Sequence, residues 1–323
     1  HILSCLENVG GELNAYTTKE ETCIHASFLK EYYNKAIELI SDVAFNSTYP
    51  TNELEKEKEV IIDEINSYRD SPAEEICDEF ENNLYRGHEM GRNILGTTDL
   101  VNGFIRNDLC NFIKNNYSTE KIIIATIGDI SFINFKNKII THFGDYQHSI
   151  TSFHRTKFQQ LPTFTKIEER NNHLSHCIIG GIAYHFDNPK KMQMILLNNI
   201  LGGPGMNSRL NLNIREKYGF TYTIESQYNA YSDTGNFLIY MGVDPHSMEK
   251  TIELVHKELN KLKPITKCPI FSFTRILKCT STAEDGYINE PVAGETFAHK
   301  RFSLSLGLGL GLIYSDWIIS SVK

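Results

Sequence analysis

Two acidic side chains seven residues apart could serve as ligands for a metal ion. Glu57 and Glu64 lie in the stretch EKEKEVIIDEINSYRD, residues 55–70, whose apolar residues recur at helical spacing. At about 100° per residue, positions seven apart on a helix lie within about 20° of each other. Carboxylate oxygens on one helix face are ligands that a divalent cation accepts. Solvated acids at the flank of a helix are the commoner reason for such a pair, so the spacing alone leaves both interpretations open.

The helix that carries this pair is predicted from about Asn52 to Tyr68. On a helical wheel one side of this helix is apolar and is expected to pack into the core, while the opposite side is acidic and is expected to face solvent. The core residues are Leu54, Ile61, Ile65 and Tyr68, and the wet ones are Glu55, Glu59 and Asp63. Glu57 and Glu64 fall at the flank of the core stripe. A carboxylate at such a border is costly to bury unless it is paired, and a cation would pair it.

The histidines of the chain do not complete a metal site by their pattern. His173 and His176 in HLSHC begin a predicted strand, where residues three apart point to opposite faces. His88 in GHEMG is predicted to lie in a loop, where it packs or caps. Neither H-E-x-x-H nor H-x-x-E-H occurs in the sequence. The imidazole ligands that zinc prefers are therefore not evident.

Composition restricts the class of protein. A length of 323 residues predicts about two domains. The net charge of −8, without a basic cluster, argues against a nucleic-acid partner. No apolar run reaches the roughly 18 residues of a membrane span, so no membrane partner is expected. Seven scattered cysteines without a C-x-x-C motif favour reduced thiols in a cytosol-like compartment.

Strand and helix patterns alternate along the chain and predict an α+β fold of two domains. The first domain is expected at 1–150, with a hairpin near its start and a buried strand at KIIIATIGDI, residues 121–130. A linker is predicted at 151–165, and the second domain at 166–323. Its helices include NSRLNLNIREKYG, with Gly219 as C-cap. After about residue 264 the pattern weakens, although RFSLSLGLGLGLIY alternates like a strand.

Five segments, taken in order, resemble the pitrilysin/insulinase family of zinc metallopeptidases, in particular its half-size branch of mitochondrial and bacterial processing proteases. They are ENVGGELNAYTTKEETCIHASFL, AIELISDVAFNST, ELEKEKEVIIDEINSYRDSPAEEICDEF, GHEMGRNILGTTDLV and LGGPGMNSRLNLNIREKYGFTYTIESQYNAYSDTGNFLIYMG. The resemblance covers most of residues 1 to about 260. It implies two domains, each an antiparallel-rich sheet with helices packed on one face.

The resemblance gives the two acids a role. Family members hold zinc with two histidines of an inverted H-x-x-E-H motif and a distal glutamate on a second helix, and the motif glutamate acts as general base. Glu64 corresponds to the distal glutamate, and Glu57 to an acid that supports the site. By the family spacing the motif falls before His1, so the first domain is expected to be truncated. Without that motif the chain as given is expected to be inactive.

Other positions carry implied roles in substrate binding. The strand LNAYT resembles the family's edge strand, where Asn14, Ala15 and Tyr16 pair with the backbone of an extended peptide. An ordinary hairpin strand is the alternative. Arg215 and Tyr222 match an Arg–Tyr pair that holds the substrate carbonyl and the oxyanion. For Arg215 the alternative is a cation that favours a helix C-terminus.

The function implied is that of a zinc-dependent metalloendopeptidase that cleaves peptides or unfolded polypeptides in a chamber between two halves. Half-size members form that chamber from two chains, so a homodimer, or a heterodimer with a related subunit, is expected. The alternatives are a non-catalytic partner subunit of the same fold and a plain interaction domain. A bacterial cytoplasmic location is expected, and a mitochondrial or periplasmic one is also compatible. Substrate preference does not follow from the sequence.

Overall fold

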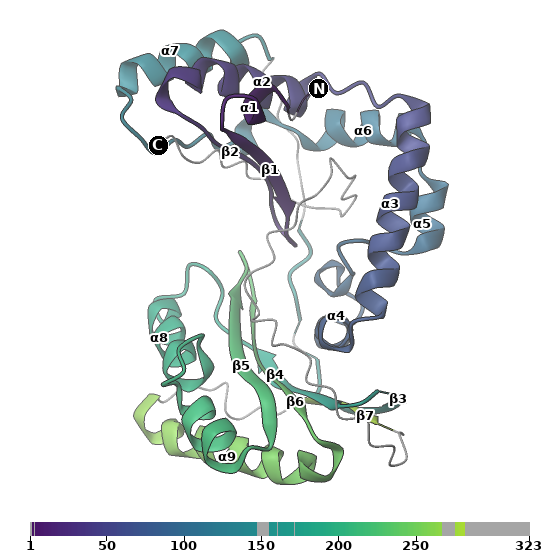
Figure 1. Cartoon of the computed structure of the whole chain (residues 1–323), viewed down its shortest axis with the longest axis vertical. Coiled ribbons are helices and arrows are strands. Elements are labelled where there is room, and N and C mark those ends of the chain that lie inside the picture. Colours follow the sequence, from purple (N-terminus) through teal and green to yellow (C-terminus); the bar gives the residue numbers. More distant parts are fainter. Residues whose placement is uncertain are drawn as a thin grey trace. The chain divides into compact units, whose positions relative to one another are not determined.

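The computed structural model of the chain describes residue 2 and residues 4–146, 155–159, 161–170, 172–266 and 275–281. These residues form two compact units with separate apolar cores (Figure 1). Of the described residues, the first unit contains those within His1–Ile65 and Asn93–Arg155, and the second contains those within Asn66–Arg92 and Thr156–Val292. Both units mix helices with strands, as an α+β fold requires. The domain boundary at 151–165 stays a prediction.

The first unit is built around a β-hairpin covered by helices. Its elements are α1 (Ser4–Glu7), β1 (Glu12–Thr17), β2 (Thr22–Ser27), η1 (Lys30–Tyr32), α2 (Tyr33–Phe45), α3 (Thr51–Arg69, which runs into the second unit), α5 (Thr98–Gly103), α6 (Arg106–Asn116), η3 (Thr119–Lys121) and α7 (Phe132–Phe143). β1 and β2 are antiparallel, and Thr17 pairs with Thr22 across the predicted turn. Ile24 and Ala26 of β2 pack against Leu6 and Ile40, because alternate strand residues face the same side.

The prediction of a buried strand at 121–130 is wrong. Residues 122–127 run between η3 and α7 without strand pairing, and Ile127 is 70% exposed. Described strands of the first unit form a two-stranded sheet of β1 and β2. An apolar run becomes a strand only where a neighbouring strand accepts its backbone hydrogen bonds. Periodicity alone does not reveal whether that neighbour exists.

The second unit is a five-stranded sheet of order β3-β7-β4-β6-β5. Its elements are α4 (Pro72–Leu84), η2 (Glu89–Gly91), β3 (Thr165–Arg170), β4 (Ser175–Ile182), α8 (Lys191–Gly202), η4 (Asn211–Glu216), β5 (Thr221–Ala230), β6 (Gly235–Val243), η5 (Pro245–Ser247), α9 (Met248–Thr266) and β7 (Arg275–Ser281). The pairs β4–β6, β5–β6 and β4–β7 are antiparallel, and β3–β7 is parallel. The predicted strand at RFSLSLGLGLGLIY lies outside the described residues.

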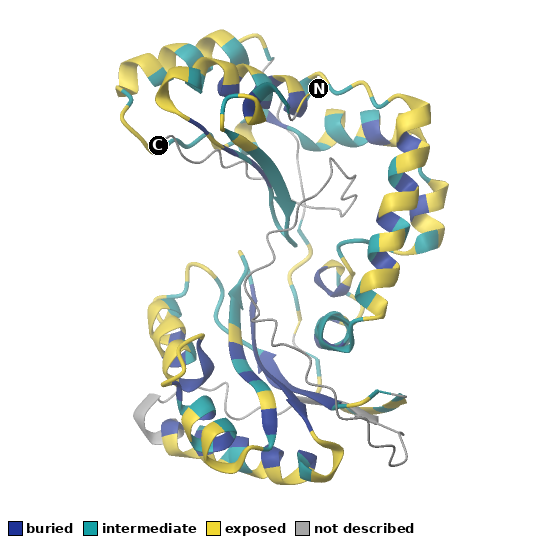
Figure 2. Ribbon diagram, in the orientation of Figure 1, coloured by how far each residue is buried: buried dark blue, intermediate teal, exposed yellow. Residues whose placement is uncertain are grey.

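Both faces of this sheet are covered, which explains the nearly continuous apolar sequences of its central strands. Ile179 and Ile239 face the core formed with α8 and α9. Ile178 and Leu238, on the alternate positions, face α4 on the other side. β4 and β6 are dark blue along most of their length in Figure 2. The central strands are thus rigidly held, and the ends of neighbouring elements can carry functional side chains.

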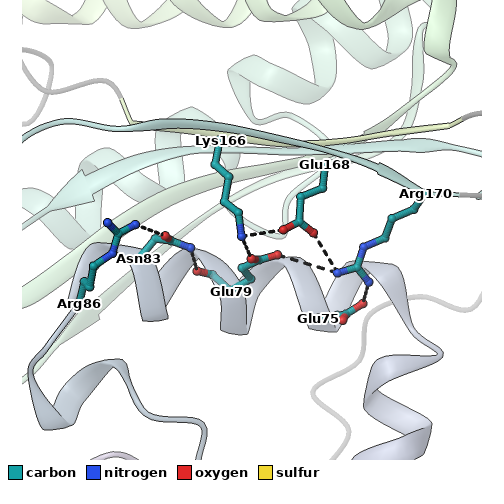
Figure 3. Close-up of polar contacts among 7 residues, drawn as sticks. All are labelled: Glu75, Glu79, Asn83, Arg86, Lys166, Glu168 and Arg170. Atoms are coloured by element: carbon teal, nitrogen blue, oxygen red, sulfur yellow. Dashed lines mark hydrogen bonds and ion pairs between the residues drawn. The ribbon is translucent and has the colours of Figure 1, made fainter.

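A network of charged side chains ties α4 to the edge strand β3 (Figure 3). Lys166 and Arg170 of β3 form ion pairs with Glu79 and Glu75 of α4. Glu168 lies between the two cations and accepts from Lys166 Nζ at 2.6 Å and from Arg170 Nη2 at 3.0 Å. Residues two apart on a strand and four apart on a helix each share a face, so the two rows align. This alignment holds α4 to the second unit.

Candidate functional site

The α3 helix places Glu64 and Glu57 at the half-buried flank of its apolar stripe, as the wheel predicts. Leu54, Ile61 and Ile65 are each about 95% buried, being 4%, 5% and 5% exposed. Burial raises the pKa of the Glu64 carboxyl above its usual range. In the part of the chain that the structure describes, that carboxylate has no hydrogen-bond or ion-pair partner. A partly desolvated anion in this situation gains from a nearby cation.

The described residues supply one candidate ligand rather than a complete zinc site. Among them no three His, Cys, Asp or Glu side chains gather closely enough to hold a metal ion. Zinc requires three protein ligands in a catalytic site. Glu64 has the chemistry of one such ligand, because its oxygens are partly desolvated and unpaired. Glu64 could therefore serve as one ligand of a zinc site whose remaining ligands lie elsewhere.

The histidines have structural roles, as the sequence suggests. His88 caps η2, because its Nδ1 accepts from Met90 N at 3.2 Å. His176 is buried in β4, and its Nδ1 is 2.8 Å from the Tyr240 hydroxyl. Burial lowers the pKa of His176. The prediction that His173 begins this strand is wrong, because β4 starts at Ser175 and His173 precedes it.

Among the described residues β1 is paired along one edge, and a side chain covers an amide on its other edge. The N–H of Ala15 donates to Oδ1 of Asn14 at 2.8 Å. Thr18 N donates to Glu21 O at 2.8 Å at the turn. Backbone groups alternate between the partner strand and the edge in an antiparallel pair, so counting back from Thr18 directs the Ala15 amide to the edge. Within the described residues, β2 is the one strand that pairs with β1.

Tyr16, the third residue predicted to bind substrate, faces the opposite way from the core. Its ring lies 6.1 Å from that of His25, between centroids. Its hydroxyl donates to Glu21 Oε1 at 3.5 Å. Burial raises the pKa of the Tyr16 hydroxyl, with further contributions from Cys23 and Glu21. Tyr16 therefore stays a neutral side chain on the polar face of the hairpin.

Arg215 lies on a π-helix, which refines the prediction of an ordinary helix. The π-helix η4 spans Asn211–Glu216. It is followed by Gly219, whose φ of +68° and whose N–H bond to Arg215 O at 2.9 Å close the helix as predicted. π-Helical turns are rare and concentrate at functional sites. The Arg215 side chain is 38% exposed and has only a marginal contact with Glu216, 4.0 Å from Nε to Oε1. Its guanidinium is therefore accessible to a ligand.

Tyr222 occupies a β-bulge at the start of β5. Thr221 pairs with Val243 and Thr223 with Gly242, so Tyr222 is the extra residue between them. The side chain is 82% exposed. The Thr221 hydroxyl fixes the bulge through contacts of 2.6 Å to Gly242 O and 2.7 Å to Thr223 O. Bulges redirect side chains and are frequent next to active sites.

The candidate residues thus fall into two groups. Glu57, Glu64 and the β1 residues belong to the first unit, whereas Arg215 and Tyr222 belong to the second. Sequence reasoning missed Thr221 and the buried Glu258 of α9. An acid at helical spacing among apolar residues, as in IELVHKEL, was the available signal for Glu258. Nothing in the sequence marks the bulge or the π-turn.

Comparison with known families assigns the chain. The family model described as "Insulinase (Peptidase family M16)" matches residues 1–98, and "Peptidase M16 inactive domain" matches residues 103–265. The chain therefore belongs to peptidase family M16, the insulinase family. Arg215 and Tyr222 lie in the second matched region, and Glu57 and Glu64 in the first.

Curated relatives agree with this assignment. The chain is 31% identical over 264 residues to the "uncharacterized zinc protease YmxG" of Bacillus subtilis, which covers 81% of this chain and 63% of that protein. It is 28% identical over 287 residues to the human "mitochondrial-processing peptidase subunit beta", covering 84% and 58%. The chain thus spans about three fifths of the length of these relatives. Their names describe a zinc protease and a subunit of a processing peptidase.

Solved structures share the fold. An M16 inactive domain from Pseudomonas fluorescens has a TM-score of 0.78 at 15% identity, over 89% of this chain and 85% of that one. A protease from Helicobacter pylori has a TM-score of 0.66 at 19% identity, over 81% and 68%. Among the described residues, no helix combines the length and apolar character that crossing a membrane requires.

Proposed function

We propose that the chain is part of a zinc-dependent metalloendopeptidase that cleaves peptides and unfolded polypeptides in a chamber between two halves. The observation that carries the proposal is the half-buried Glu64 carboxylate, which has no partner among the described residues. Glu64 supplies one zinc ligand, and Glu57, on the same flank of α3, supports the site. Zinc, when bound, supplies Lewis-acid chemistry at the scissile carbonyl. The other ligands come from outside the described residues.

The residues of this chain hold and orient the peptide. The edge of β1 away from β2 receives an extended substrate through main-chain hydrogen bonds at Ala15, after the Asn14 amide gives up its contact. Tyr16 lies beside this edge. Arg215 and Tyr222 donate hydrogen bonds to the substrate carbonyl and to the oxyanion that develops from it. Their placement on a π-turn and a bulge supports this role.

Cleavage of an unfolded polypeptide by the complete protein tests the proposal. We expect cleavage that a chelator abolishes and added zinc restores. Glu64→Gln keeps the shape of the side chain but removes its charge, so it should abolish cleavage. Asp63→Asn, a neighbouring exposed acid on the wet side of α3, is the matched control and should cleave normally. Cleavage at the normal rate by Glu64→Gln would refute the assignment.

A non-catalytic partner subunit is the second candidate. The presence of Glu57 with Glu64, and of Arg215 with Tyr222, argues against it and for the metalloendopeptidase. In either case we propose a homodimer, or a heterodimer with a related subunit, because a chamber needs two halves. Light scattering measures the mass of the assembly. A cytoplasmic location stays a prediction, which fractionation of the cells that make the protein would check.

A further inference from the structure

The α9 helix carries a buried carboxylate that binds the segment containing Arg215. Glu258 is 3% exposed. Its Oε2 accepts from Arg209 at 2.7 Å (Nη2) and 3.1 Å (Nε), and from Asn213 Nδ2 at 3.3 Å. Its Oε1 accepts from Lys261 Nζ at 2.5 Å. Both oxygens are therefore occupied, and three of the four donor atoms come from the helical segment that includes η4.

These contacts keep Glu258 ionised. Burial alone would raise the pKa of its carboxyl, and this is the largest single effect. Hydrogen bonds from Lys261 and Arg209, with the charges of the two cations, together outweigh it and hold the pKa below its usual range. A buried ionised carboxylate binds its donors firmly, because leaving either side unpaired is expensive. Glu258 therefore acts as a fixed anchor for the segment opposite it.

Glu258 contacts the helical segment of η4 on the side opposite Arg215. Arg209 precedes η4 and Asn213 lies within it, four residues later, so the two side chains share a helix face. Leu210 and Ile214 are fully buried and pack the apolar side of this segment into the core. Arg215 comes two residues after Asn213 and is therefore about half a turn away. Its direction is set by how η4 is wound.

The winding of η4 is of a kind that contacts with neighbouring elements can hold in place. A π-helix has one more residue per hydrogen-bonded ring than an α-helix and is rarely stable by itself. α-Type bonds flank it here, from Leu212 N to Ser208 O at 2.9 Å and from Gly219 N to Arg215 O at 2.9 Å. Relaxation of the π-turn to an α-helix would move the following residues around the axis. The Arg215 side chain would then point in a different direction.

We propose that Glu258 is a positioning residue for Arg215, holding the π-helix η4 through Arg209 and Asn213 in the winding that directs the guanidinium to the substrate. This inference rests on the proposed function of Arg215.

A double-mutant cycle tests the inference by kcat and KM for an unfolded polypeptide, in the complete protein. Arg215→Ala should lower kcat by about 10²–10³-fold, the usual loss for one oxyanion donor. Glu258→Gln should lower kcat by about 10–100-fold through misplacement of that donor, and change KM little. In the Arg215→Ala background, Glu258→Gln should cause no further loss. If the fold-loss of kcat in the double variant equals the product of the two single losses, the inference is overturned, because Glu258 then acts independently of Arg215.

A structural measurement separates this inference from the proposed function. Amide hydrogen exchange at 211–216 should accelerate by at least about 10-fold in Glu258→Gln, as local opening becomes easier. Glu253→Gln is the matched control, since Glu253 is an exposed acid of α9 that pairs with Lys250; it should leave exchange and kcat unchanged. If the unaltered protein cleaves nothing, the proposed function fails, and exchange still decides whether Glu258 holds η4. Equal exchange in the Glu258→Gln and unaltered proteins would overturn the inference.

Discussion

Replacing Thr221 by valine should loosen the bulge that presents Tyr222. The hydroxyl of Thr221 lies 2.6 Å from Gly242 O and 2.7 Å from Thr223 O, and the residue is 5% exposed. Valine has the same shape, so the change removes the hydroxyl without leaving a cavity. The structure thus isolates a polar contribution to the bulge.

The expected loss follows from the number of protons available. One hydroxyl proton serves both carbonyls, which corresponds to one net hydrogen bond of about 0.5–1.5 kcal/mol. A buried carbonyl left short of a donor adds a further penalty of similar size. We therefore expect the free energy of unfolding of the second unit to fall by about 1–3 kcal/mol. Its Tm should fall by about 2–12 °C.

Urea unfolding followed by far-UV circular dichroism measures this change. An unchanged m-value would show that the variant and the unaltered protein expose the same surface on unfolding. Thr223→Val is the matched control, because in the described structure the Thr223 hydroxyl makes no hydrogen bond. The control should lose less than about 0.5 kcal/mol. Equal losses in the two variants would refute the claim that the Thr221 hydroxyl fixes the bulge.

Three further changes test other parts of the account. Gly202→Ala should lower the free energy of unfolding by about 1–3 kcal/mol, because a Cβ at this position would lie 2.7 Å from Ser226 N. Gly205→Ala is the control, since its Cβ would meet only a flexible side chain. Thermal unfolding of the two variants measures the difference. Burial depresses the folded-state pKa of His176, so the unfolded state takes up its proton first, and stability should fall as pH drops below about 6.5. His176→Gln should reduce that slope in urea titrations at several pH values. Ala15→Pro removes an edge amide outside the β1–β2 ladder, so binding of a fluorescent extended peptide should be lost while circular dichroism stays unchanged.

Local patterns predicted the helix that carries Glu57 and Glu64 and the hairpin near the start of the chain. The wheel of α3 separates Leu54 and Ile61, which are buried, from Glu55 and Asp63, which are exposed. The hairpin near the start of the chain follows from alternation on either side of its turn residues. These features depend on neighbours close in sequence. They could therefore be predicted without any knowledge of tertiary contacts.

Features that depend on distant partners were not predictable. No described strand pairs with the apolar run at 121–130, and the run is irregular. Lys58 is buried because its Nζ donates to Asn102 O at 3.2 Å, from a helix 44 residues later. Of the candidate site, the identity of Glu64, Arg215 and Tyr222 came from resemblance. The π-turn and the bulge that direct the last two are set by packing against α9 and β6.

Metal analysis of the complete protein tests the central claim about Glu64 most directly. We expect stoichiometric zinc in the unaltered protein and a sharp loss of zinc, with loss of cleavage, in Glu64→Gln. Glu57→Gln should mainly impair activity and weaken zinc affinity by no more than on the order of 10- to 100-fold, as expected for a supporting group. Full zinc content and undiminished cleavage in Glu64→Gln would contradict the account.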